Sequence, residues 1–145
     1  MKKLIFLLLL GFTINAHAQE AGEKLFKAVI NKDLASVKKI VQKDSALVNY
    51  VRKINQSFFI PVLMQAVMNN ETEIAKLFIL KGADVNKQDG FKMTCLMWAA
   101  SNQNLELVKL LLEKGADKNV KDHQGMTALK AAEETKNAEI IDLLK

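Results

Sequence analysis

The sequence has one cysteine, one arginine and two histidines, and each scarcity excludes a class of protein. A single cysteine, Cys95, allows no internal disulfide, so packing must hold the fold together. Phosphate and base recognition favour the arginine fork, so the lone Arg52 argues against a nucleic-acid partner. After residue 18 the only histidine is His123, too few ligands for a zinc site. The scattered glycines form no phosphate-binding loop.

The apolar run near the N-terminus is too short to span a bilayer, which takes about 20 apolar residues. It follows Lys2 and Lys3 and ends before the small-residue site Ala16-His17-Ala18. This layout is typical of a secretory signal peptide. We therefore expect residues 1–18 to be removed, which leaves a mature chain of residues 19–145 that begins at Gln19. The expected location of this chain is the periplasm or the outside of the cell.

Positive charge is concentrated in the first part of the expected mature chain. Between Gln19 and Gln56 the basic residues outnumber the acidic ones, and they are Lys24, Lys27, Lys32, Lys38, Lys39, Lys43, Arg52 and Lys53. A solvated lysine face is the simplest interpretation. Attraction to acidic proteins or anionic lipid headgroups is the alternative.

An internal repeat organises the rest of the sequence. The segment Lys-Gly-Ala-Asp-Val-Asn at 81–86 returns as Lys-Gly-Ala-Asp-Lys-Asn at 114–119, an offset of 33 residues. The pattern Thr-x-Leu-x-x-Ala at 94–99 returns at 127–132 with the same offset. Leu63 and Ala66 extend the register backwards, and a weaker copy begins at Leu25.

Each copy carries the signals of two helices separated by a tight turn. The apolar spacing at Ile74, Leu77 and Phe78 is helical. Gly82 and Gly115 follow the second helices, where a left-handed residue ends a helix. The expected helix-capping side chains are Thr94 and Thr127 for first helices, and Asp33, Asn70, Asn104 and Asn137 for second helices.

The 33-residue period and its two motifs resemble the ankyrin repeat, over essentially all of residues 20–145. The resemblance implies an all-α solenoid of about four helix-turn-helix units with short hairpin loops. The units are expected at 20–56, 57–89, 90–122 and 123–145, and the two middle ones match the family most closely. The family's glycine that opens the second helix is replaced by Lys32, Asn70, Gln103 and Lys136.

No arrangement of side chains indicates catalysis, a cofactor or a metal. Cys95 is expected inside a packed helix start and His123 at a hairpin tip, so they do not form a nucleophile–base pair. Asp84 and Asp117 belong to the repeated turn and are interpreted as structural. An enzyme with an unrecognised site remains the rival hypothesis.

The resemblance implies that partners contact the loop tips and the exposed side of the first helices. Carried over by position, the expected binding residues are Phe91, Met93, His123, Gln124, Met126, Ser101, Asn102, Met68 and Asn69. Phe91 is the leading anchor, because aromatics dominate interfaces; the alternative is that it folds over the adjacent loop. An insertion near Phe58 and Phe59 is either an enlarged tip or extra packing.

The expected function is a non-catalytic protein–protein interaction module of the cell envelope. An inhibitor, an immunity protein or an accessory factor for a periplasmic enzyme fits equally well. A monomer is expected in the absence of the partner. Association of the lysine-rich first unit with an anionic membrane surface is the third alternative.

Overall fold

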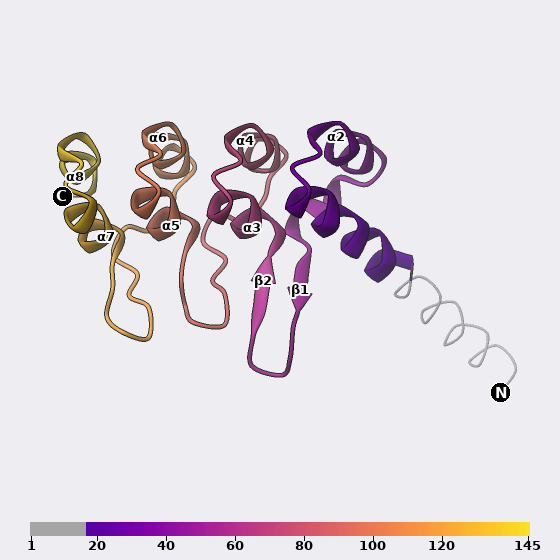
Figure 1. Ribbon diagram of the computed structural model, residues 1–145, viewed down its shortest axis with the longest axis horizontal. Helices are drawn as coiled ribbons and strands as arrows, with labels where there is room; N and C mark the ends of the chain where they lie inside the picture. The colour runs from indigo at the N-terminus through magenta and orange to yellow at the C-terminus, as the bar shows by residue number, and fades with distance from the viewer. Residues whose placement is uncertain (1–16) are drawn as a thin grey trace, which may run out of the picture.

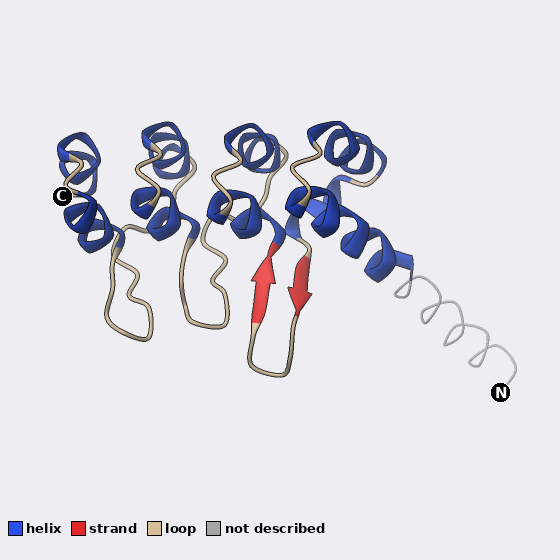
Figure 2. Cartoon of the chain, in the orientation of Figure 1, coloured by secondary structure: helices blue, strands red, loops and turns tan. Residues whose placement is uncertain are grey.

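The computed structural model describes residues 17–145, which form four helix pairs stacked in a row with hairpin loops on one side (Figures 1 and 2). A helix over residues 17–30 begins the first pair. The elements after it are α2 (Leu34–Lys43), a 3₁₀ helix η1 (Ser45–Asn49), β1 (Val51–Lys53), β2 (Phe59–Pro61), α3 (Val62–Met68), α4 (Thr72–Leu80), α5 (Cys95–Ser101), α6 (Leu105–Glu113), α7 (Ala128–Thr135) and α8 (Ala138–Leu144). The predicted all-α repeat fold is therefore confirmed. The expected signal peptide lies mostly outside the described residues.

The predicted helix caps are present with one exception. Thr94 and Thr127 cap the first helices α5 and α7, and their side chains accept N–H groups of the first turn. The side chains of Asp33, Asn104 and Asn137 cap second helices in the same way. The prediction for Asn70 is wrong: Glu71 occupies the cap position of α4, and no side chain caps that helix.

Asn70 cannot cap α4 because its backbone is left-handed, with φ of 56°. Lys32, Gln103 and Lys136 hold the same conformation at the equivalent turns, with φ of 58°, 56° and 57°. These are the positions where the family has glycine, which adopts positive φ without strain. The chain thus keeps the family's turn geometry at a cost in local stability.

The core is a continuous apolar layer between the helix pairs. The motif leucines Leu63 and Leu96 are almost entirely buried, as are Phe78 and Leu107 on second helices. Each helix pair packs against the next, so a unit buries its apolar faces only with its neighbours.

Asparagine side chains also link successive units, through hydrogen bonds at exposed positions. Asn86 donates its amide N–H to the Gly115 carbonyl (3.0 Å) and accepts the Asp117 N–H (2.8 Å). Asn49 makes the same two bonds to Gly82 and Asp84, at 3.3 and 2.8 Å. The asparagines that recur in the copies of the sequence therefore mark hydrogen bonds between neighbouring units.

Gly115 ends α6 with a left-handed residue, as predicted, at φ of 82°. Open space surrounds the position where a Cβ atom would stand, so a substitution there is opposed by backbone strain alone. Gly115→Val is expected to lower the free energy of unfolding by about 1–2 kcal/mol, measured by urea denaturation. Gly115→Asn is the matched control and should lose less, because asparagine tolerates this conformation. Equal losses of unfolding free energy in the two variants would contradict a left-handed backbone at Gly115.

The first hairpin departs from the expected short loop. β1 and β2 pair antiparallel, with Arg52 opposite Ile60, and the ladder continues where the Ile54 N–H donates to the Phe58 carbonyl at 2.9 Å. Figure 1 shows that this hairpin projects further from the helices than the two that follow. The insertion is thus used to lengthen the hairpin.

The base of the hairpin is fixed to the helix over residues 17–30. The Tyr50 hydroxyl donates to the Glu23 carboxylate at 2.6 Å and accepts the Gln19 amide at 2.9 Å. Its ring lies so close to Gly22 that a Cβ atom there would overlap it. Burial, together with the bond to Glu23, raises the pKa of Tyr50, so the phenol stays protonated and keeps donating.

Candidate protein-binding surface

An aspartate builds the tip of each of the two later hairpins. The Asp89 carboxylate accepts the N–H groups of Phe91 (2.8 Å) and Met93 (2.9 Å). Asp122 does the same for Gln124 and Met126, both at 2.8 Å. These bonds fix the tip backbone, so the side chains at the tips are presented in a defined arrangement.

Backbone hydrogen bonds join each hairpin to the next, and the first of them joins the second tip to strand β2. The Gly90 N–H donates to the Phe59 carbonyl, and the His123 N–H donates to the Phe91 carbonyl, both at 3.2 Å. A Cβ atom on Gly90 would lie 2.6 Å from the Ser57 carbonyl oxygen, so only glycine permits this close approach. The three hairpins therefore form one joined edge along the solenoid, called the hairpin edge below.

Phe91 combines the two arrangements considered from the sequence. The residue is 57% exposed, and its ring packs against Phe58 of the preceding hairpin, with the centroids 5.0 Å apart and the planes tilted by 50°. Phe91 thus contacts the adjacent loop and still presents more than half of its surface to solvent. Ile54 lies beside Phe58 on the first hairpin and is 51% exposed.

The other predicted binding residues vary in accessibility. His123, Gln124 and Ser101 are exposed, whereas Met126 and Asn69 are half-buried. Three further half-buried residues have contacts with the rest of the fold: Met68 and Met93 pack against the core, and the amide of Asn102 donates to the Val67 carbonyl at 2.8 Å.

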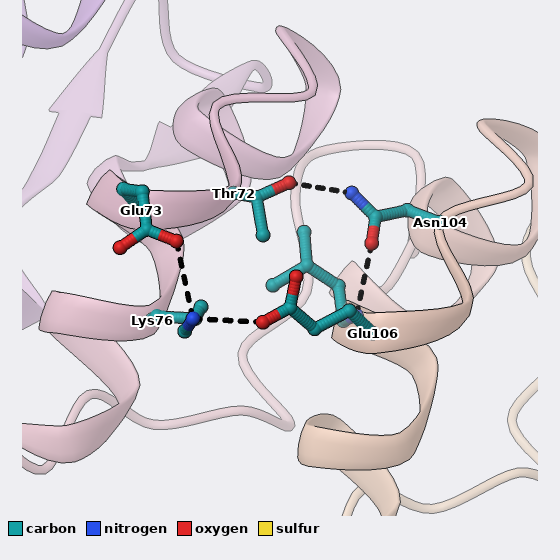
Figure 3. Close-up of polar contacts among 6 residues, drawn as sticks. Thr72, Glu73, Lys76, Asn104 and Glu106 are labelled. Carbon is teal, nitrogen blue, oxygen red and sulfur yellow. Dashed lines mark hydrogen bonds and ion pairs between the residues drawn. The ribbon is translucent and has the colours of Figure 1, made fainter.

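The face formed by the second helices carries ion pairs between units (Figure 3). Lys76 on α4 bridges Glu73 of its own helix at 3.1 Å and Glu106 of α6 at 2.7 Å. The hydrogen bond to Glu106, then that to Glu73, raises the pKa of Lys76. Lys109 on α6 pairs with Glu139 of α8 at 2.8 Å. These exposed ion pairs thus join α4 to α6 and α6 to α8, and pairs of this kind contribute little to stability.

Asn104 adds an uncharged link at the same junction. Its amide donates to the Thr72 hydroxyl at 2.7 Å, while its own oxygen caps α6 (Figure 3). The same amide also donates to the Asn70 side-chain oxygen at 2.7 Å. The displaced Asn70 thus receives a bond from the next unit in place of capping its own helix.

The two groups considered for nucleophilic chemistry lie in different environments. Cys95 is fully buried at the start of α5, and His123 is exposed at a hairpin tip. Burial raises the pKa of the Cys95 thiol to about 12. Among residues 17–145 no three His, Cys, Asp or Glu side chains gather as metal ligands. No helix in this range is long and apolar enough to cross a membrane.

The buried thiol leads to a simple labelling prediction. Because the thiolate is the reactive form, the native chain should resist a disulfide reagent at about pH 8. The same chain in denaturant should react with one equivalent within minutes. Rapid labelling of the native chain would show that the start of α5 opens readily.

A stack of helix pairs with a joined hairpin edge defines a helical-repeat solenoid. The family model for ankyrin repeats (three copies) matches residues 63–145, which is more than half of the chain. The chain belongs to the ankyrin repeat family, whose repeats form protein–protein interaction modules and are generally non-catalytic. The first unit lies before the matched residues. None of the curated proteins compared matches the chain.

Proposed function

We propose that this chain is an exported, non-catalytic module that binds another protein of the cell envelope along its hairpin edge. The observation that carries the proposal is Phe91. This aromatic residue is 57% exposed and lies on a tip whose backbone is fixed by Asp89 and by the bond from His123. Rigid exposed aromatics are typical interface anchors, because little conformational entropy is lost when they bind.

The proposed location rests on the N-terminal sequence. Lys2, Lys3, the short apolar run and the site Ala16-His17-Ala18 support export and cleavage. Within the envelope, a small binding module suits an inhibitor, an immunity protein or an accessory factor for a periplasmic enzyme.

Fractionation tests the location. The chain should be recovered from the soluble periplasm with Gln19 at its N-terminus, as measured by N-terminal sequencing. Recovery of an intact Met1 in the membrane fraction would show that residues 1–18 anchor the protein.

Affinity capture tests the binding function. The mature chain, immobilised through its C-terminus, should retain a specific protein from a native envelope extract, identified by mass spectrometry. A matched column carrying the chain in denatured form is the control. Retention of the same proteins on both columns would overturn the proposal.

A further inference from the structure

The proposed cleavage after Ala18 makes Gln19 the first residue of the mature chain, and glutamine is chemically reactive at that position. Its α-amino nitrogen can attack the Cδ atom of its own side chain. A new C–N bond then closes a five-membered lactam, the bond from Cδ to Nε2 breaks, and this nitrogen leaves as ammonia. The product is pyroglutamate. The ordinary pKa of an α-amino group lies close to physiological pH, so part of the amine is uncharged and able to react.

The structure gives the side chain of Gln19 a defined contact. Gln19 lies near the start of the helix over residues 17–30, and its Nε2 amide donates to the Tyr50 hydroxyl at 2.9 Å. The two residues are 31 positions apart, so the contact forms only when the base of the first hairpin is folded against the helix. It joins two side chains and does not involve residues 17 and 18, which cleavage removes.

The Tyr50 hydroxyl is itself fixed in position. It donates to the Glu23 carboxylate at 2.6 Å, so its oxygen lone pairs are free to accept the Gln19 amide. The Tyr50 ring lies directly against Gly22. Gly22 and Glu23 follow Gln19 by one helical turn and therefore lie on its face of the helix. The acceptor for the Gln19 amide is thus held beside the start of the mature chain.

The bond between Gln19 and Tyr50 opposes ring closure. Nε2 is the atom that donates to Tyr50, and it is also the atom that leaves as ammonia, so the lactam cannot keep this bond. Closure also requires Cδ to fold back onto the α-amino nitrogen, whereas the bond directs the carboxamide toward another part of the fold. The open glutamine is therefore stabilised relative to the reacting conformation.

We propose that Gln19 is a site of pyroglutamate formation in the mature chain, and that Tyr50 restrains this reaction by holding the Gln19 carboxamide. The inference rests on the proposed export, which exposes the Gln19 amine. Tyr50 is a positioning residue, because it takes no part in the bond changes and keeps the reacting atoms apart. Folding of the first hairpin thus preserves the free N-terminus.

The rate of ammonia loss, followed by intact-mass spectrometry, tests the inference. Gln19 is exposed in vitro by a site-specific protease that removes a tag placed directly before it. Tyr50→Phe keeps the ring beside Gly22 and lacks the hydroxyl, so it should lose ammonia about two- to tenfold faster than wild type, the factor that one ordinary hydrogen bond contributes. Gln19→Glu is the control for ammonia released from other amides and should show no such loss.

Guanidinium chloride supplies the matched comparison, because unfolding removes the contact with Tyr50. Wild-type and Tyr50→Phe chains should then react at the same rate, and the wild-type chain should react faster unfolded than folded. Equal rates in the two folded chains, or a difference that persists in denaturant, would overturn the inference. So would a wild-type chain that keeps its ammonia in both states.

The inference and the proposed export fail separately. Because the N-terminus is made in vitro, the measured rates report on Gln19 and Tyr50 whatever happens in cells. An uncleaved chain in the membrane fraction would refute export and leave these rates unchanged. A chain that begins at Gln19 in the periplasm, together with equal rates for folded wild type and Tyr50→Phe, would refute the restraint and leave export standing.

Discussion

Changing Phe91, Met93, His123 and Met126 together to alanine is expected to abolish capture of the envelope partner. These residues occupy the two later tips, and the largest share of the loss should come from Phe91, because interface energy concentrates in a few anchors. Retention of the partner on the immobilised variant, measured against wild type by quantitative mass spectrometry, tests this expectation.

The structure determines which controls make that experiment decisive. Met93 packs against the core, so the fourfold variant should lose some stability. Phe91→Ala/His123→Ala removes two largely exposed side chains and, apart from the contact between Phe91 and Phe58, no packing, so it should lower the unfolding midpoint only slightly while losing most of the capture. Lys76 and Lys109, which lie away from the tips, are unsuitable controls because both hold inter-unit ion pairs. Lys38→Ala/Lys39→Ala serves instead, and loss of capture there would move the site to the second helices.

Leu96→Ala is expected to lower the free energy of unfolding by about 2–5 kcal/mol. Leu96 is fully buried in α5, the first helix of the third unit, which packs against α3, α6 and α7. Truncation leaves a cavity that the surrounding helices fill only in part. Equilibrium urea denaturation followed by circular dichroism measures the loss.

The chain offers a closely matched control for this substitution. Leu80 at the end of α4 is 66% exposed, so Leu80→Ala removes the same atoms without opening a cavity. It should change stability by less than about 0.5 kcal/mol. Similar effects of the two substitutions would show that the register of the repeat is wrong.

Much of the fold could be predicted because the residues that begin and end the helices recur in the copies of the repeat. Thr94 and Thr127 cap helices and Gly115 ends one, and each effect depends on the residue's own backbone position. Asn70 was predicted wrongly because a polar side chain one position too early looks equivalent in the sequence. The left-handed backbone of Asn70 prevents it from capping α4. That conformation depends on how the chain turns between α3 and α4.

The binding surface could be predicted only in part, because it depends on contacts between units. Phe91 was identified from its position at a tip, but its packing against Phe58 requires the lengthened first hairpin. The ion pair between Lys76 and Glu106 joins residues that are 30 positions apart, and no local pattern records that contact. Sequence reasoning thus located the tips and missed what joins them.

Site-specific photocrosslinking at the hairpin edge tests the central claim most directly. A photoreactive phenylalanine analogue replaces Phe91 in one chain and Lys38 in another, and each is expressed in the cells from which the protein comes. Irradiation should attach a protein to the chain labelled at position 91 and none to the chain labelled at position 38. A crosslink formed only at position 38, or none at either position in cells where the partner is captured by the wild-type chain, would contradict binding through the hairpin tips.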